Sequence, residues 1–479
     1  MMEGQIFIGN RWSAPASGAT IPVFDPSTGL EYARIARGGK EDILRAVTAA
    51  RRAFEGTWGK MAPVERGRII SRLCRDILDH HEELAQIEAR NTGKPLRQAR
   101  ADITACARYC EFYGGAPDKL HGETIPYTPG YTVLTLREPH GVVGIILPWN
   151  YPAQMFGRNV VAPLAAGNTV VVKPAEDACL SILKLSEMAV AAGLPEGVLN
   201  VVPGYGLEAG AALAEHPDVN FISFTGSPQA GTNVAKAAAQ HHCPLTLELG
   251  GKSPQIVFSD TDIEETLPPL VNAVVQNAGQ TCSAGSRVLI EASFYEEFLQ
   301  RLGDRFQSLR VGPSSEDLDC GPLIRSGQME RVKGFLKEAR EANLATVGCG
   351  TIVEGAPETG YYVPPQVLRD VPPTHRIAQE EVFGPVLVAM PFRDEEEAIK
   401  LANGTPFGLA AGVWTRNGAR QMRLARALRC GQVFVNNYGA GGGVELPFGG
   451  VKRSGYGREK GMEGLLGFTV LKTIVLRHG

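Results

Sequence analysis

From residue 141 onward, short runs of apolar residues alternate with longer segments in which apolar positions recur every three or four residues. The short runs predict buried strands and the longer segments predict amphipathic helices. Buried strands separated by helices are typical of a parallel sheet with helices on both faces. The strands expected in this first region are Gly141–Leu147, Thr169–Val172, Val198–Val202, Phe221–Phe224 and Leu245–Leu249.

A second alternating region begins after Gly250 and predicts a second α/β domain. Between its first two strands we expect a helix that carries Cys282 near its far end. The expected strands are Ile256–Phe258, Val288–Ile290, Pro385–Met390, Gly408–Trp414 and Gln432–Asn436.

The start of the chain predicts short strands, then helices from Glu41, over Val64–Ala89 and over Pro95–Tyr113. Two strand-like segments, Tyr131–Arg137 and Thr469–Leu476, have no helical partner. They are candidates for pairing with each other or across a subunit boundary, or are two strands of one domain's sheet.

Composition narrows the class of protein. A chain of 479 residues with 44% hydrophobic and 21% charged residues can bury two or three large cores. The net charge of −3 does not indicate the excess of basic residues expected of a protein that binds nucleic acid. The longest apolar run is too short to cross a bilayer, and the first residues lack a secretory pattern. The nine cysteines show no metal-binding spacing, so we expect a cytoplasmic protein without a metal site.

Polar residues follow four of the expected strands. They are Trp149-Asn150, Lys173 with Glu176, Thr225-Gly226-Ser227, and Glu248. Ligands of parallel sheets bind beyond the carboxyl ends of the strands, so this pattern predicts a nucleotide-type crevice.

Cys282 lies among small and polar residues, with Gly279 before it and Gly285 after it. The absence of bulk lets the backbone approach a ligand, so the thiol is a candidate nucleophile. A free cysteine that only fills the core is the alternative.

Six motifs together resemble those of NAD(P)-dependent aldehyde dehydrogenases, in the family's order and over essentially the whole chain. They are Pro148–Pro152, Phe224–Ser227, Leu247–Lys252, Gly279–Cys282, Glu381–Pro385 and Pro447–Gly450.

The resemblance implies two doubly wound α/β domains and a small β-flap that joins subunits into a homodimer or homotetramer. The implied parts are an NAD-binding domain (1–117 and 139–250), a catalytic domain (251–460) and the flap (118–138 and 461–479).

The resemblance also implies a catalytic set. Cys282 matches the nucleophile, which would form a thiohemiacetal and then a thioester with the aldehyde. Asn150 matches a hydrogen-bond donor to the developing oxyanion. Glu248 matches the general base for hydrolysis of the thioester, and its place at the end of an apolar strand predicts a raised pKa.

For the cofactor, the resemblance implies NAD, with NADP possible. A carboxylate beside the adenosine ribose accepts from both hydroxyls and would repel a 2′-phosphate. The matching residues are Lys173 and Glu176 at this ribose, Trp149, Gly226 and Ser227 near the pyrophosphate, and Glu381 and Phe383 at the nicotinamide ribose.

The substrate residues implied by the resemblance are Tyr151, Met155, Arg158 and Phe448. Arg158 could pair with a distant carboxylate of a semialdehyde substrate, although the second arginine of succinic semialdehyde enzymes is replaced by Gln276. Alternatively, Arg158 is a structural ion-pair partner.

Two other classes would explain parts of the pattern. A cysteine hydrolase would use Cys282 but needs a histidine partner, and none of the nine histidines lies in a matched motif. A binding protein of the same fold would tolerate loss of Cys282 or Glu248, and both are present.

Overall fold

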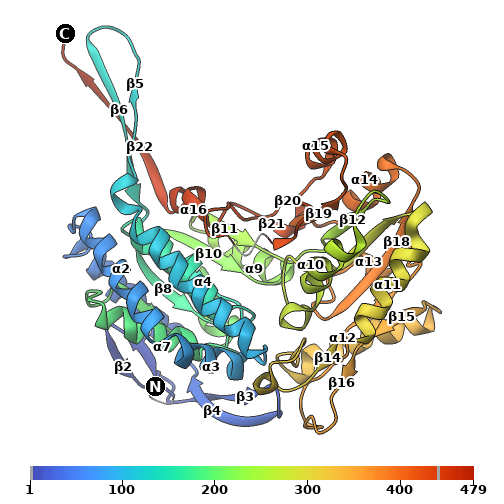
Figure 1. Ribbon diagram of the computed structural model, residues 1–479. Helices are drawn as coiled ribbons and strands as arrows, with labels where there is room; N and C mark the ends of the chain where they lie inside the picture. The colour runs from blue at the N-terminus through green and yellow to red at the C-terminus, as the bar shows by residue number, and fades with distance from the viewer. Residues whose placement is uncertain (1–3, 440–442) are drawn as a thin grey trace.

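The computed structural model describes residues 4–439 and 443–479, so residues 1–3 and 440–442 of the expected domains lie outside the described part. Figure 1 shows two lobes, with a long β arm extending from one of them. A mostly parallel sheet forms the centre of each lobe, which confirms the predicted α/β class.

The first lobe contains an eight-stranded sheet in the order β2-β1-β9-β8-β7-β10-β11-β21. The stretch from β9 to β11 is parallel, and β1 and β21 add antiparallel strands at its two sides. All five predicted strands are present to within one residue. The bounds are β1 Ile6–Ile8, β2 Arg11–Ser13, β7 Val142–Ile146, β8 Thr169–Lys173, β9 Leu199–Val201, β10 Phe221–Thr225, β11 Leu245–Glu248 and β21 Gly455–Tyr456.

Helices cover both faces of this sheet. In β8, Val171 packs with α1 (Lys40–Glu55), α8 (Ala211–Ala214) and α9 (Pro228–Ala239). Its neighbours Val170 and Val172 point to the opposite face. That face is covered by α2 (Pro63–Asp79), α4 (Leu96–Gly114) and α7 (Leu180–Ala191).

The single helix predicted over Val64–Ala89 is wrong, because the segment forms α2 and then α3 (His81–Thr92). His80 leaves helical geometry at φ −108° and ψ 22°. Its N–H donates to Asp76 at the end of α2, and its carbonyl accepts from Leu84 at the start of α3. One residue therefore serves both helix ends, which apolar spacing does not reveal.

The second lobe contains a seven-stranded sheet in the order β15-β17-β18-β13-β12-β19-β20, in which only β15 is antiparallel to its neighbour. Helices α10 and α11 pack on one face, and α12, α14 and α15 pack on the other. The strands are β12 Pro254–Val257, β13 Arg287–Glu291, β15 Thr346–Cys349, β17 Gln366–Leu368, β18 Val386–Phe392, β19 Ala410–Trp414 and β20 Gln432–Val435. The helices are α10 Ile263–Val275, α11 Tyr295–Gln307, α12 Ser326–Glu341, α14 Glu395–Asn403 and α15 Gly418–Ala427.

Cys282 does not lie on a helix, contrary to the prediction. Helix α10 ends at Val275, and a short turn over Gln276–Gly279 follows. Within it, Asn277 and Ala278 have φ of +49° and +54°. Left-handed residues cannot continue a right-handed helix, so Cys282 lies on the loop that leads to β13.

The β arm joins the two strand-like segments noted in the sequence. Strand β22 (Thr469–Arg477) pairs antiparallel with β6 (Tyr131–Pro139) along its whole length, and β5 (Thr124–Ile125) lies on the other side of β6. The predicted pairing of these segments with each other is confirmed. The domain boundaries stay a prediction, and β21, from the range assigned to the catalytic domain, belongs to the first sheet.

Within the described ranges, no helix combines the length and the apolar character needed to cross a membrane.

Candidate functional site

The carboxyl ends of four neighbouring strands lie at one edge of the first sheet. Ile146 of β7 pairs with Lys173 of β8 and with Phe224 of β10, and Thr225 of β10 pairs with Glu248 of β11. The polar clusters after these strands therefore lie side by side, as the strand pattern predicts.

The Cys282 loop packs against this edge. The side-chain amide of Asn150 donates to the Gln280 carbonyl at 2.9 Å, and the Tyr151 hydroxyl lies 2.7 Å from Thr281 Oγ1. A side chain at Gly251 would come within 2.5 Å of the Cys282 carbonyl, so only glycine lets the loop after Glu248 pack this closely. The structure thus brings together the segments that carry the three predicted catalytic residues.

The surroundings of the Cys282 thiol favour its protonated form. Burial raises its pKa to about 12, Arg158 opposes this effect, and Glu248 and Glu381 add to it. The thiolate is the nucleophilic form of cysteine, so Cys282 needs a base that accepts its proton.

Glu248 meets the electrostatic requirements of such a base. Glu248 is 2% exposed and lies at the end of β11. Burial and the neighbouring Glu459 raise its pKa well above the usual range, and the positive charge of Arg158 lowers the pKa only in part. This direction agrees with the prediction. Among the described residues, neither carboxyl oxygen has a hydrogen-bond partner, so both are available to a thiol or a water.

Arg158 is an ion-pair partner in this structure. Its Nε lies 2.5 Å from Glu459 Oε2, an ion pair rather than an aligned hydrogen bond, and its Nη2 lies 3.9 Å from Glu248 Oε2. The guanidinium also stacks over the Phe448 ring at 4.4 Å. Burial opposes the charge of Arg158, but the two carboxylates outweigh it, so the pKa of Arg158 stays above its ordinary value. The arrangement favours the structural reading of Arg158.

Sequence reasoning missed Glu459. This carboxylate is 2% exposed and accepts from Asn159 Nδ2 at 2.5 Å and from Ser223 Oγ at 3.3 Å. Its backbone pairs with Phe448. The only available signal was a charged residue shortly after the glycine-rich Pro447–Gly450 motif, which does not by itself predict burial.

Three of the four predicted substrate residues lie on one helical segment or directly before it. Tyr151, Met155 and Arg158 are spaced by four and three residues, which places them along one side of it. The sequence pattern missed this segment, which consists of α5 (Pro152–Met155), a π-helical turn (Phe156–Val161) and α6 (Ala162–Ala165). It is almost wholly buried, so no polar face marks its period.

Lys460 is a second residue that the sequence did not reveal. Its ammonium lies 5.7 Å from the centre of the Phe448 ring, on the same aromatic side chain as Arg158. Burial and the Arg158 charge lower the pKa of Lys460 to about 7, although Cys282 and the nearby carboxylates act in the other direction. The site therefore holds a buried amine that titrates near neutral pH.

The predicted cofactor residues form three groups. Lys173 Nζ and Glu176 Oε2 are 2.9 Å apart after β8. Ser227 follows Gly226 and caps α9, where its hydroxyl accepts from the Ala230 N–H. Glu381 Oε1 accepts from the Gly251 N–H at 2.9 Å.

The predicted cofactor residues Trp149 and Phe383 are in contact, edge to face, with ring centres 5.5 Å apart. These residues fit a dinucleotide. The buried Thr225 hydroxyl, just before Gly226, has no partner among the described residues. The start of a helix beside it offers N–H groups suited to a phosphate.

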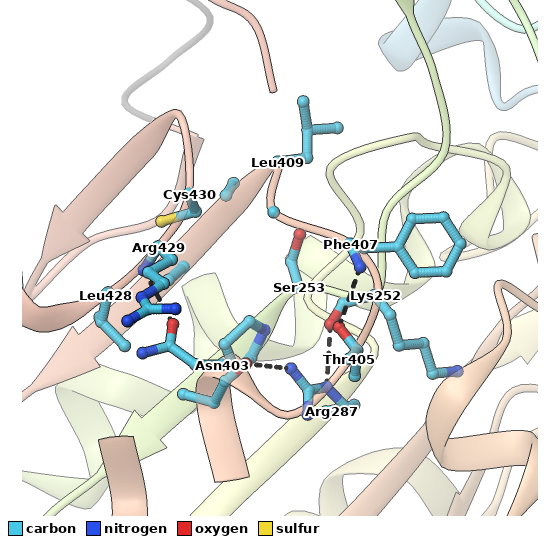
Figure 2. Close-up of a pocket in the computed structure, with 15 residues that line it drawn as sticks. Lys252, Ser253, Arg287, Asn403, Thr405, Phe407, Leu409, Leu428, Arg429 and Cys430 are labelled. Carbon is cyan, nitrogen blue, oxygen red and sulfur yellow. Dashed lines mark hydrogen bonds between the residues drawn. The ribbon is translucent and has the colours of Figure 1, made fainter. Parts of the chain in front are cut away.

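A small cavity beside the site is a separate feature (Figure 2). Arg287 lies in its wall and donates to the carbonyls of Lys252, Leu401 and Ala402, each at 2.8 Å. None of Cys282, Glu248 and Asn150 lines it. Arg287 holds neighbouring chain segments together there, and the cavity is not the predicted crevice.

These features define a class: an α/β protein with two wound sheets and a half-buried cysteine on a loop between them, next to a carboxylate and an amide. The model of the aldehyde dehydrogenase family matches residues 12–474. A mitochondrial aldehyde dehydrogenase family 2 member B4 from Arabidopsis thaliana is 44% identical over 98% of this chain and 88% of its own length. The chain therefore belongs to the aldehyde dehydrogenase family.

Solved structures that resemble this chain support the same family assignment. A crystal structure of a protein from Burkholderia cenocepacia is 65% identical, with a TM-score of 0.99 over 99% of this chain and 100% of the other. The NAD⁺ complex of an aldehyde dehydrogenase from Bacillus cereus is 39% identical, with a TM-score of 0.96 over 100% and 97% of the two chains. The predicted family, fold class and enzyme class are confirmed.

Proposed function

We propose that this protein oxidises an aldehyde to its carboxylic acid with NAD, through a thioester on Cys282 that is released by hydrolysis. The observation that carries the proposal is the packing of the Asn150 amide and of the loop after Glu248 against the Cys282 loop. A cysteine hydrolase would instead place a histidine beside the thiol. The charged groups that interact with Cys282 here include Arg158, Lys460, Glu248 and Glu381, and the partners that the structure records for the thiol include no histidine.

The residues divide the reaction into steps. The Cys282 thiol loses its proton to solvent, a transfer that Glu248 speeds by relaying the proton, and the sulfur bonds to the carbonyl carbon, so that the negative charge moves to the oxygen. Asn150 donates a hydrogen bond to this oxygen. When bound, NAD accepts the hydride that leaves the carbon. With its carboxylate free again, Glu248 takes a proton from water, which attacks the thioester. The C–S bond then breaks, the carboxylic acid leaves, and Glu248 returns the proton to the Cys282 sulfur.

For the cofactor, we propose that Lys173 and Glu176 hold the adenosine ribose, that Gly226 and Ser227 hold the pyrophosphate with Trp149 beside them, and that Glu381 and Phe383 hold the nicotinamide ribose. The Glu176 carboxylate lies within hydrogen-bond distance of the Lys173 ammonium, so the two side chains form one polar group after β8. A negative group there favours NAD over NADP. The Glu381 carboxyl is held by the Gly251 N–H, and burial raises its pKa to about 7.

A panel of aliphatic, aromatic, ω-carboxy and ammonium aldehydes, each offered with NAD and with NADP, tests the proposal. We expect absorbance at the reduced-nicotinamide band to rise with several aldehydes, and to rise faster with NAD. If no aldehyde reduces either dinucleotide, the proposed function is wrong.

The same panel tests specialisation for a semialdehyde that carries a distant carboxylate. Arg158 is already bound to Glu459 and stacked on Phe448, so a substrate carboxylate would have to displace Glu459. A new pair between Arg158 and the substrate and the lost pair with Glu459 are each worth about 1.5–3 kcal/mol, so they largely cancel. We therefore expect kcat/KM for ω-carboxy aldehydes to stay within about tenfold of the value for plain aldehydes of equal length. A larger preference for ω-carboxy aldehydes would show that Arg158 binds the substrate.

We further propose that the β arm joins copies of this chain into a dimer or tetramer. Strand β22 is an edge strand, and its Leu471 and Val475 are 52% and 56% exposed. An exposed apolar edge strand is a template for pairing with a second chain. In Figure 1 the arm extends away from both lobes, where a second copy could reach it.

Sedimentation provides the measurement for this assembly. We expect the protein to sediment at a multiple of its chain mass of 51.3 kDa, and Leu471→Lys with Val475→Lys to shift it toward the monomer. Met422→Lys, at a 56% exposed site on α15, is the matched control and should leave the mass unchanged. Sedimentation of the unmodified protein as a monomer would contradict the proposal.

We also propose that the protein is cytoplasmic. All nine cysteines are free in the structure, as expected in a reducing compartment. Recovery of the protein in a membrane or secreted fraction of its cells would contradict this location.

A further inference from the structure

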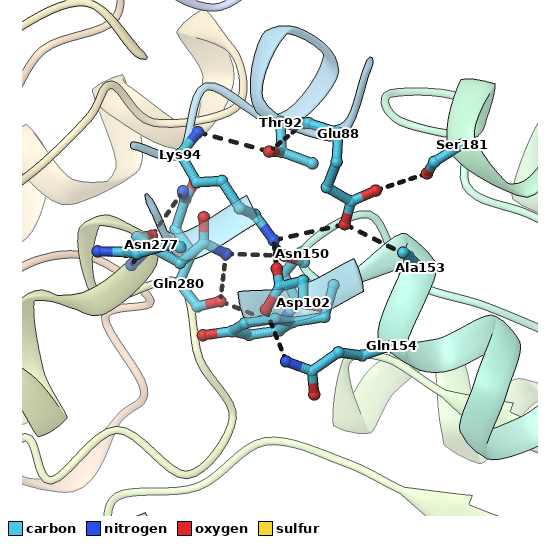
Figure 3. A network of polar contacts seen from close by, with 12 residues as sticks. Glu88, Thr92, Lys94, Asp102, Asn150, Ala153, Gln154, Ser181, Asn277 and Gln280 are labelled. Carbon is cyan, nitrogen blue, oxygen red and sulfur yellow. Dashed lines mark hydrogen bonds and ion pairs between the residues drawn. The ribbon is translucent and has the colours of Figure 1, made fainter. Parts of the chain in front are cut away.

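A buried polar cluster surrounds the backbone of Asn150 (Figure 3). We call it the Lys94 cluster: Lys94, Glu88 and Asp102, which are 1%, 0% and 3% exposed. Glu88 lies on α3 and Asp102 on α4, so the cluster joins two helices to the segment that begins at Asn150. Burial of three charged groups is costly unless each is paired, so the pairing defines the role of the cluster.

The Lys94 ammonium contacts both carboxylates of the cluster and the backbone of Asn150. It pairs with Asp102 Oδ2, it lies 3.5 Å from Glu88 Oε1, and it donates to the Asn150 backbone carbonyl at 2.9 Å. It also lies 4.4 Å from the centre of the Tyr151 ring.

The two carboxylates are themselves fixed by the segment after Asn150. Glu88 accepts from the Ser181 hydroxyl at 2.5 Å and from the Ala153 N–H at 3.3 Å. Asp102 accepts from Gln154 Nε2 at 2.6 Å. The position of Lys94 relative to Asn150 is therefore set from several directions.

Asn150 is held at both of its ends. Its backbone carbonyl accepts from Lys94 and also from Asn277 Nδ2 at 2.9 Å, and its side-chain amide donates to the Gln280 carbonyl at 2.9 Å. Two donors on one carbonyl fix the orientation of that peptide group. Since the Asn150 side chain starts from this backbone, its direction toward the Cys282 loop is fixed as well.

We propose that Lys94 is a positioning residue for Asn150, and that it acts on oxyanion stabilisation without touching the reacting atoms. The inference rests on the proposed function, because it needs Asn150 to be the oxyanion donor. Replacement of Lys94 by an uncharged residue leaves the Asn150 carbonyl with one donor and the two carboxylates without a cation. The Asn150 amide then loses its fixed direction, and a donor misplaced by a fraction of an ångström stabilises the oxyanion poorly.

A double-mutant cycle tests the inference. The variants are Lys94→Met, Asn150→Ala and the combination, with single-turnover formation of NADH as the readout. We expect Asn150→Ala to slow this step by about 10²–10³-fold, the typical cost of one oxyanion donor. Lys94→Met should slow it by at least about tenfold with the KM for NAD unchanged, and should have little further effect when Asn150 is already alanine.

Thr92→Val is the matched control. The Thr92 hydroxyl is buried in the same region and donates to the Glu88 backbone carbonyl at 2.7 Å, but it does not contact Asn150. This variant should lower thermal stability without slowing the NADH-forming step. If Lys94→Met does not fold, Lys94→Met with Asp102→Asn removes one cation and one anion together and is put through the same cycle.

Independent effects, in which the rate losses of Lys94→Met and Asn150→Ala multiply, would overturn the inference. So would an unchanged single-turnover rate in a folded Lys94→Met protein. These outcomes leave the proposed function intact, because the unmodified enzyme remains active. An unmodified protein that forms no NADH with any aldehyde overturns both.

Discussion

Cys282→Ala is expected to abolish aldehyde-dependent NADH formation, with a rate loss of at least about 10⁴-fold. Without the sulfur, the carbonyl carbon has no covalent partner and cannot reach the tetrahedral state from which its hydride leaves. Neither Glu248 nor Asn150 can replace this bond. The measurement is NADH absorbance over time with saturating aldehyde and NAD.

Cys349→Ala is the matched control for this loss, because Cys349 is an exposed thiol at the edge of the second sheet. It should retain full activity. The thermal midpoints of both variants should lie close to that of the unmodified protein. Aldehyde oxidation by a folded Cys282→Ala protein at the original rate would contradict the assignment of Cys282.

Glu248→Gln is expected to keep a rapid first release of NADH and to slow steady turnover by about 10²–10⁴-fold. The amide has nearly the same shape but cannot accept a proton from the water that attacks the thioester. NADH therefore forms once per site and then stops at the slow step. Rapid-mixing absorbance resolves the two phases, and loss of the first phase would show that Glu248 chiefly generates the thiolate.

The pH dependence gives a second measurement on the same variant. Glu248 must be unprotonated to act as a base, so turnover falls as the pH falls through its pKa. Burial and Glu459 raise this pKa, so we expect the fall well above the ordinary glutamate value of about 4.3. In Glu248→Gln this acidic limb should disappear, and a limb that persists would belong to another group.

The strands of the first sheet were predictable because each is a short apolar run bounded by turn residues. Their carboxyl ends then placed Asn150, Lys173 and Glu248 at one edge. The helix-like spacing before Cys282 predicts a helix that is too long. Asn277 and Ala278 adopt left-handed backbone angles and end the helix early, which the spacing of apolar residues does not show.

The charged groups around the site were harder to predict. Lys94 and Glu459 read as ordinary surface residues. Both are buried because their charges are paired: Lys94 with Glu88 and Asp102 on two different helices, and Glu459 with Arg158 far away in the chain. Lys94 meets the Asn150 carbonyl 56 positions away, and Glu459 meets Asn159 300 positions away. Periodicity describes one element at a time, so it carries no information on such pairs.

The long pairing of β22 with β6 also bears on the order of events during synthesis. Strand β6 leaves the ribosome early, whereas β22 is the last element of the chain. Domains fold as units from the N-terminus, so β6 must wait with one open edge while both lobes form. A nascent chain that is halted before Thr469 would therefore hold an unpaired strand, which closes once Thr469–Arg477 has been made.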